Sequence, residues 1–183
     1  GKTLLPGFID CHFHLLLGSL ELENIHGEAA SSFEELAEIV KTFAAENPGK
    51  PWLNGFGLKY SLGPGHVPLT RGHLDAIIQD RPLYLMGYDG HTAWANTLAL
   101  EKAGILHGAE CGANSEVVLD ERSEATGELR EGGAHEKIEK LLPQPDEAMK
   151  RRLLQKGLAL ASSMGVTSVH NMDGDEEQAA LYA

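Results

Sequence analysis

Short apolar runs alternate with amphipathic helical patterns along this 183-residue chain, and the alternation limits the folds that it can adopt. Strand-like runs occupy residues 4–14, 52–57, 83–88 and 166–170. Helical patterns, with apolar residues three and four positions apart, lie between these runs. Strands that alternate with helices form parallel βα units, whose sheet must be covered on both faces or closed into a barrel. The sequence therefore predicts an α/β fold.

Cap residues mark the ends of the predicted helices. Ser32 followed by Glu35 is a capping-box pattern, and Thr70 is an N-cap candidate for a shorter helix. Two further helices are predicted over residues 92–103 and 147–163, each followed by a glycine suited to a left-handed backbone.

The length of the chain limits how much of a barrel it can form. A complete (β/α)8 barrel needs about 250 residues, so this chain can supply only some of the units. We therefore predict one domain, residues 1–183, that is part of a TIM-type barrel, with an irregular excursion around residues 108–130. Residues 117–130 resemble a hairpin or an excursion outside the main scaffold. A small doubly wound binding protein is an alternative, although no Gly-rich phosphate loop supports it.

Two histidines end the first predicted strand. Side chains on a strand alternate between faces, so Asp10, His12 and His14 share one side. Neutral imidazoles bind zinc and similar divalent metals, and Asp10 could orient one ring through a hydrogen bond. Ligands at the carboxyl end of a strand also lie where barrel enzymes have their active sites. Two solvent-exposed histidines without a ligand are the simpler alternative.

The residues around this pair closely resemble the first barrel strand of the amidohydrolase superfamily. There a Pro-Gly-Phe-Ile-Asp stretch, here Pro6 to Asp10, leads into the His-x-His metal ligands. Other segments resemble the YtcJ-like, or amidohydrolase-3, group, which includes N-substituted formamide deformylases. These segments are 52–57, 69–74, 89–96, 127–131 and 165–170. The resemblance covers nearly the whole chain and implies the N-terminal section of such a barrel.

The resemblance implies an enzyme that hydrolyses carbon–nitrogen bonds other than peptide bonds, in amides or formamides. In the family a metal centre, commonly zinc, activates the attacking water, and His12 and His14 correspond to two of its ligands. The other ligands are an often carbamylated lysine, two histidines and an aspartate, downstream of a motif like residues 165–170. We therefore expect a divalent metal in the parent protein and no activity in the isolated chain.

Four polar residues near predicted strand ends are candidates for substrate binding. His91 could polarise a substrate carbonyl, although Asp89 could instead form a capping turn for the following helix. Glu131 could approach the site from a loop, although a solvated carboxylate at a helix start is the simpler interpretation. His170 ends the last predicted strand and could line the cavity. Relatives often have Asp where this chain has Asn171, which argues against an acidic role there.

The charge balance argues against phosphate-bearing partners. The chain has 15 basic and 27 acidic side chains, and its net charge of −12 repels nucleic acids and anionic lipids. We expect a small-molecule substrate, and the edges of an incomplete barrel could join copies into a homo-oligomer. The distant Cys11 and Cys111, and the lack of an apolar run of about 20 residues, favour the cytoplasm. A non-catalytic interaction module that associates through an exposed sheet edge is the alternative function.

Overall fold

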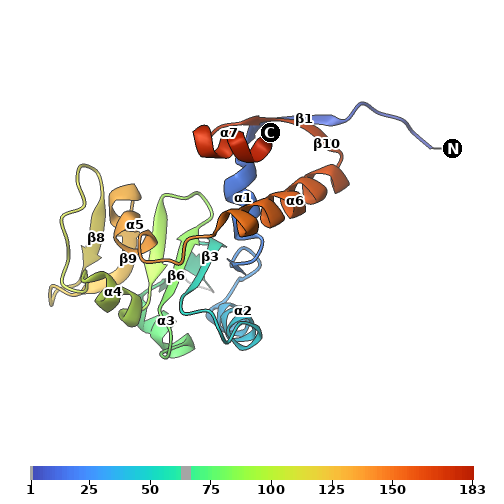
Figure 1. Ribbon diagram of the computed structural model, residues 1–183. Coiled ribbons are helices and arrows are strands. Elements are labelled where there is room, and N and C mark those ends of the chain that lie inside the picture. The colour runs from blue at the N-terminus through green and yellow to red at the C-terminus, as the bar shows by residue number, and fades with distance from the viewer. Residues whose placement is uncertain (1, 63–66) are drawn as a thin grey trace. The chain divides into compact units, whose positions relative to one another are not determined.

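The computed structural model describes residues 2–62 and 67–183, and the contacts of the chain divide it into two compact units. Residues 1–23 and 144–183 form the first, which we call the two-stranded unit. Residues 24–143 form the second, the six-stranded unit. Figure 1 labels the helices and several of the strands of both units. In the sequence, the six-stranded unit is therefore inserted between the two halves of the two-stranded unit.

The two-stranded unit contains one parallel strand pair and three helices. Its strands are β1 (Phe8–Phe13) and β10 (Val166–Asn171). Its helices are α1 (Leu15–Glu21), α6 (Glu147–Ser163) and α7 (Glu176–Tyr182). Phe8 pairs with Val166 and Phe13 pairs with Asn171, so both strands end at the same edge. Residues that follow β1 and residues that follow β10 are therefore spatial neighbours.

Helices α1 and α6 pack closely against each other. Leu15 and Leu16 of α1 share a buried cluster with Leu154 of α6. Further along the contact, Gly157 faces Ser19, and a Cβ atom at position 157 would lie 1.9 Å from the Ser19 Oγ. The absence of a side chain at Gly157 thus permits the close approach of the two helices.

The six-stranded unit is built on one mixed sheet. In spatial order its strands are β2 (Ile25–His26), β3 (Leu53–Leu58), β6 (Leu83–Gly87), β7 (Thr92–Ala95), β9 (Ala125–Arg130) and β8 (Glu116–Leu119). The first three are parallel to one another, and the last three are antiparallel to their neighbours. A short antiparallel pair, β4 (Ser61–Leu62) and β5 (Val67–Pro68), lies outside this sheet.

Helices cover both faces of this sheet. The helices α2 (Phe33–Glu46) and α3 (Arg71–Ile77) pack on one face, and α4 (Thr97–Ala103) and α5 (Gly132–Glu139) pack on the other. In Figure 1, α2 lies beside α3 and α4 lies beside α5. Along β6, Leu83 and Leu85 enter the core with α2 and α3, whereas Tyr84 enters the core with α4 and α5. A strand buried on both faces has the continuous apolar sequence seen here.

The predicted capping signals are confirmed. The Ser32 side chain begins α2 and accepts a hydrogen bond from the Glu35 amide at 3.2 Å. Thr70 begins α3 and forms a capping box with His73. Gly104 ends α4 with a left-handed φ of 69°. None of the helices in residues 2–62 and 67–183 is long and apolar enough to cross a membrane.

The helix predicted over residues 92–103 is wrong in its first part. Residues 92–95 form β7, and α4 begins only after Asn96. All four residues of β7 are buried, and pairing with β6 on one side and β9 on the other satisfies their backbone groups. The apolar pattern of this segment is the same for a buried strand as for a buried helix, so the pattern alone could not separate them.

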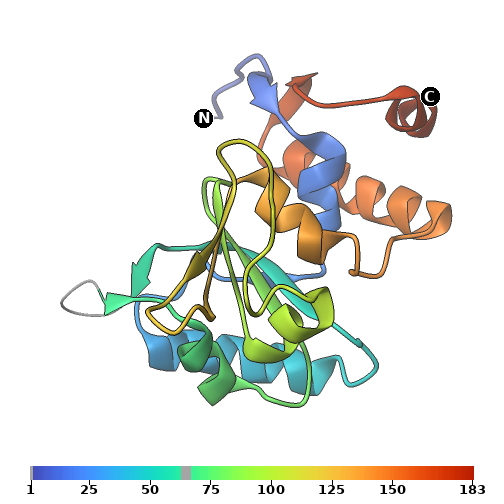
Figure 2. The ribbon, with the colours of Figure 1, turned by 90° about the vertical axis from the view of Figure 1, so that its left-hand side faces the viewer.

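The segment around residues 108–130 is irregular only in its first part, since residues 108–115 form no helix or strand and the two strands that follow belong to the scaffold. Strands β8 and β9 form the antiparallel hairpin that the sequence indicated, but this hairpin continues the main sheet. Figure 2 shows it in yellow beside the green strands. Val117, Ala125 and Leu129 lie in the core. Charged residues alternate with these buried positions, as they do on a strand with one solvated face.

The four predicted strands belong to two different sheets. β1 is parallel to β10 and β3 is parallel to β6, as predicted, but no sheet among the described residues contains all four. The alternation of strands and helices predicts that βα units form, and it leaves open which strands pair. The observed fold is mixed α/β, with the β1–β10 pair separate from the six-stranded sheet.

Candidate functional site

The side chains of His12 and His14 lie together at the end of β1. His12 is in the strand, and His14 is the N-cap residue of α1. Their ring centroids are 5.3 Å apart, and the ring planes are inclined by 65°. Two imidazoles on one tetrahedral zinc, with Zn–N distances of about 2.0–2.1 Å, have centroids roughly 5 Å apart. Since both side chains are also exposed, the pair fits a shared divalent metal.

The carboxylate of Asp173 holds the ring of His14. Nδ1 of His14 donates a hydrogen bond to Oδ1 of Asp173 at 2.8 Å, and Gln178 donates to Oδ2 at 3.2 Å. Burial acts to raise the pKa of Asp173, but the hydrogen bonds from Gln178 and His14 outweigh it and lower the pKa. Asp173 is therefore an anion at neutral pH. With the proton on Nδ1, the lone pair of the His14 ring is on Nε2.

The turn after β10 is fixed to the turn after β1. Oδ1 of Asn171 accepts a hydrogen bond from the Leu15 amide at 2.8 Å, and the Met172 amide donates to the Phe13 carbonyl at 2.8 Å. These contacts bring Asp173 to the histidine pair, although the two segments lie at opposite ends of the sequence. Sequence reasoning missed Asp173. The sequence feature that could have identified it is the acidic segment in which it lies. This segment directly follows the predicted strand 166–170, which could be parallel to β1.

Asp10 and His170 occupy the positions expected from the strands. Oδ1 of Asp10 accepts a hydrogen bond from the His12 backbone amide at 3.0 Å, so this carboxylate supports the backbone of the strand end. A contact of Asp10 with a ring stays a prediction. His170 is exposed on β10, one residue before the end of the strand, and its place in a cavity also stays a prediction.

Asp89, His91 and Glu131 come together in the six-stranded unit. Nδ1 of His91 lies 3.3 Å from Oε2 of Glu131, and the Glu131 amide donates to the His91 carbonyl at 2.8 Å. Oδ1 of Asp89 accepts a hydrogen bond from the His91 amide at 3.1 Å. Asp89 thus stabilises the turn between β6 and β7 instead of capping a helix. Glu131 is the N-cap residue of α5. This position agrees with the simpler interpretation of Glu131 as a carboxylate at a helix start.

Tyr60 extends this polar cluster. Its hydroxyl donates to Oδ2 of Asp89 at 3.0 Å and lies 3.0 Å from Oγ1 of Thr92. The contact with Thr92 acts to lower the pKa of Tyr60, but burial and the Asp89 carboxylate raise it overall. Burial acts to raise the pKa of Asp89, but hydrogen bonds from the His91 amide and Tyr60 lower it overall. At neutral pH, Asp89 is therefore an anion and Tyr60 is a neutral donor.

The candidate metal centre contains fewer ligands than a metal ion needs. Within residues 2–62 and 67–183, no group of three or more His, Cys, Asp or Glu side chains is arranged to hold a metal ion. Catalytic zinc sites normally have three protein ligands. His12 and His14 therefore fit as two members of a larger set.

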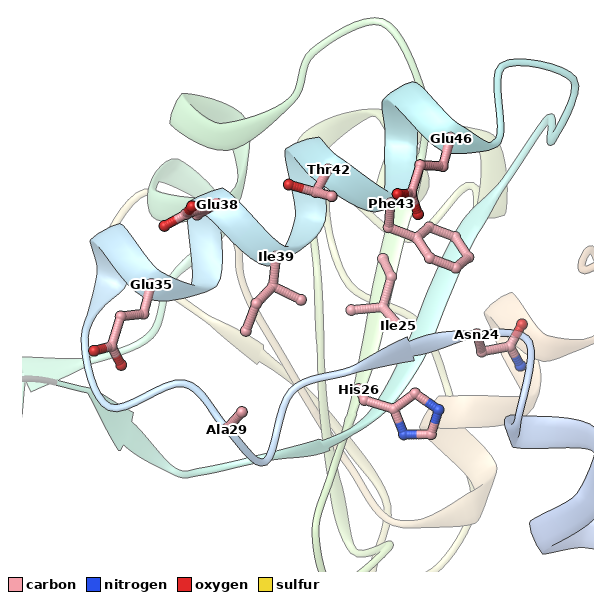
Figure 3. A pocket seen from close by; sticks show the side chains of 10 residues that line it. All are labelled: Asn24, Ile25, His26, Ala29, Glu35, Glu38, Ile39, Thr42, Phe43 and Glu46. Carbon is pink, nitrogen blue, oxygen red and sulfur yellow. The ribbon is translucent and has the colours of Figure 1, made fainter. Parts of the chain in front are cut away.

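A groove of about 510 Å³ lies between β2 and α2 in the six-stranded unit (Figure 3). The side chains of Ile25, Ile39 and Phe43 face one another between the strand and the helix, and the groove is also lined by Glu35, Glu38 and Glu46 of α2. None of the predicted metal or substrate residues lines the groove. This groove is therefore not the candidate metal centre.

Fold and site together define the class of protein: an α/β chain in which a parallel strand ends on two imidazoles at the spacing of metal ligands. The chain belongs to the amidohydrolase family, whose family model matches residues 1–183. The resemblance of the sequence to the amidohydrolase-3 group is thereby confirmed.

Relatives with longer sequences match most of the chain. It is 29% identical to Protein LONG AFTER FAR-RED 3 of Arabidopsis thaliana, over 92% of this chain and 29% of that protein. It is 27% identical to N-substituted formamide deformylase of Arthrobacter pascens, over 74% of this chain and 25% of that protein. A crystal structure of an uncharacterized metal-dependent hydrolase from Pyrococcus horikoshii OT3 superposes with a TM-score of 0.59 at 26% identity, over 97% of this chain and 33% of that one. The chain thus spans 25% to 33% of the length of these relatives.

Proposed function

We propose that the protein containing this chain is a metal-dependent amidohydrolase that hydrolyses carbon–nitrogen bonds other than peptide bonds, in amide-like or formamide-like substrates. The observation that carries the proposal is the pair of imidazoles 5.3 Å apart at the end of β1, in a chain of the amidohydrolase family. The similarity to N-substituted formamide deformylase and to a metal-dependent hydrolase supports the reaction class.

His12 and His14 would hold a divalent metal, which we propose to be zinc. Such a metal supplies Lewis acidity and lowers the pKa of water to about 7, so that water can attack a carbonyl carbon at neutral pH. The chain would contribute two imidazoles, and the rest of the protein would contribute the other ligands. Because two ligands are fewer than a catalytic zinc needs, the 183 residues alone are proposed to be inactive.

The strands β1 and β10 would be neighbours in a TIM-type barrel. Parallel strands linked through helices are the repeating unit of such barrels. Phe8 and Ile9 of β1 are 62% and 63% exposed, whereas barrel strands have their apolar side chains covered by other strands and helices. Since the chain spans 25% to 33% of the length of its relatives, further strands of the whole protein are the proposed cover.

Substrate-binding roles are proposed for Asp89, His91 and Glu131 in the six-stranded unit and for His170 in the two-stranded unit. An imidazole beside a carboxylate, as in the His91–Glu131 contact, is held in orientation and can bind a polar group of a substrate through its other ring nitrogen. Glu131 also has a left-handed φ of 63°, which costs a residue with a side chain about 1 kcal/mol or more. Strained residues of this kind cluster at ligand-binding sites, which supports a role for Glu131 beyond starting a helix.

A non-catalytic α/β interaction module is the second candidate. Among the described residues, neither β1 nor β10 has a second neighbour in its sheet, so both outer edges have unpaired backbone groups. Such edges could associate with another chain or join copies into a homo-oligomer. For the enzyme, we propose a small-molecule substrate, no nucleic-acid or membrane partner, and a cytoplasmic location.

Turnover of N-formyl and N-acyl compounds by the full-length protein tests the enzyme proposal. We expect hydrolysis that a chelator abolishes and added metal restores. His12→Ala should lower the rate by more than about 100-fold, since even residues that only support a metal ligand contribute about 10–100-fold. His107→Ala, which changes an exposed histidine outside the proposed site, should leave the rate unchanged. Equal rates in both variants would contradict the proposal.

A further inference from the structure

The hydrogen bond between His14 and Asp173 joins two segments from different strands. Asp173 does not belong to the His-x-His segment and comes from the turn after β10. The Nδ1–Oδ1 distance is 2.8 Å, and the two side chains are 43% and 31% exposed, so the contact is partly shielded from water. A hydrogen bond to an ionised acceptor is roughly twice as strong as one between neutral groups. The contact is therefore suited to fix the orientation of the imidazole.

Helix α7 holds Asp173 in place. Gln178 donates to Oδ2 of Asp173 at 3.2 Å, and Oε1 of Gln178 accepts a hydrogen bond from the Tyr182 hydroxyl at 2.9 Å. Asp175 begins α7 by accepting a hydrogen bond from the Gln178 amide at 2.9 Å. Each oxygen of the Asp173 carboxylate thus has its own donor, one from the histidine and one from the helix.

We propose that Asp173 is a positioning residue for the metal centre, which keeps the proton of His14 on Nδ1 and presents Nε2 to the metal. A histidine whose other ring nitrogen donates to a carboxylate is a more basic ligand, and its ring is oriented before the metal binds. The inference rests on the proposed function. It gives the ring-orienting role to Asp173 instead of Asp10, whose Oδ1 is engaged by the His12 amide.

Zinc affinity of the full-length protein, measured by competition with a chromogenic chelator, tests this role. Asp173→Asn keeps the size of the side chain and removes its charge, and we expect the Kd for zinc to rise about 10–100-fold. Asp175→Asn is the matched control, because it changes a carboxylate two residues away and Asn caps a helix equally well. Its Kd should equal that of the wild type. Asp173→Glu, which retains the carboxylate, should recover part of the affinity.

A spectroscopic readout separates positioning from a general effect on the turn. The visible absorption of the Co²⁺-loaded protein depends on the geometry of the ligands. We expect its bands to shift in Asp173→Asn and to stay in place in Asp175→Asn. Gln178→Met, which removes the donor from α7 to Asp173, should raise the Kd in the same direction by a smaller factor.

His14→Ala distinguishes a failure of this inference from a failure of the proposed function. If His14→Ala loses zinc while Asp173→Asn and Gln178→Met bind zinc like the wild type, the positioning role is wrong and the metal centre stands. If His14→Ala binds zinc like the wild type, both the metal centre and the role of Asp173 are wrong. Weaker binding in Asp173→Asn, with an unchanged Kd in Asp175→Asn, supports the inference.

Discussion

At the residue scale, Asn96 is completely buried, and its side chain makes four hydrogen bonds. Oδ1 accepts from the amides of Leu83 at 2.9 Å and Ala99 at 3.0 Å. Nδ2 donates to the carbonyls of Ile78 at 3.2 Å and Arg81 at 3.0 Å. One side chain thus caps α4 and also ties the end of α3 to the start of β6.

Replacement of this side chain should be costly. We expect Asn96→Ala to lower the free energy of unfolding by about 2–4 kcal/mol, because it leaves several buried backbone groups without partners. Asp146→Ala is the control, since this exposed N-cap of α6 accepts a hydrogen bond from the Met149 amide, and its loss should cost about 1 kcal/mol. Urea unfolding measures both values, and equal losses would show that the buried network adds nothing to the cap.

Glu23 gives the stability of the two-stranded unit a defined pH dependence. Hydrogen bonds from Arg152 and then Lys156 lower the pKa of Glu23 from 4.5 to about 2. Because the pKa is lower in the folded state, the stabilisation is fully present above pH 4.5 and is lost as the pH falls toward 2. At pH 7 we expect Glu23→Gln to lower the free energy of unfolding by about 0.5–1 kcal/mol, since its partners are largely exposed. Urea unfolding at several pH values should show this difference shrinking below pH 4.5, and a growing difference would contradict the assignment.

At the element scale, the close contact of α1 and α6 depends on a glycine in mid-helix. Alanine is the better helix former, so Gly157→Ala would stabilise an isolated α6 by about 1 kcal/mol. In the protein, we expect it to lower the melting temperature, because the new Cβ would lie 1.9 Å from the Ser19 Oγ and overpacking costs about 1–3 kcal/mol. Gly18→Ala in α1 is the control, since a Cβ there meets nothing within 4 Å. Calorimetry should show opposite shifts for the two variants, and a stabilised Gly157→Ala would disprove the tight contact.

The elements themselves could be predicted where the signal is local. The capping residues Ser32 and Thr70 lie within a few positions of the groups they bond, so the starts of α2 and α3 follow from the sequence. Residues 92–95 could not be assigned in this way. Their strand conformation depends on pairing with β6 and β9, and that pairing is a property of the tertiary structure.

At the scale of the whole molecule, the sequence predicted the α/β class and the pair of imidazoles but not the division into two sheets. His12 lies in β1 and His14 directly follows the strand, so local backbone geometry brings their rings together. Asp173 reaches His14 only because β1 and β10 are parallel neighbours, which the alternation of elements does not specify. The chain forms two compact units, and one barrel domain over residues 1–183 stays a prediction.

The central claim is that His12 and His14 bind the metal of a hydrolase. Anomalous diffraction from crystals of the metal-loaded, full-length protein, collected at the absorption edge of that metal, tests this claim most directly. We predict an anomalous peak about 2.0–2.1 Å from one ring nitrogen of each of the two histidines. A metal bound elsewhere in the protein, with neither imidazole in contact with it, would contradict the account.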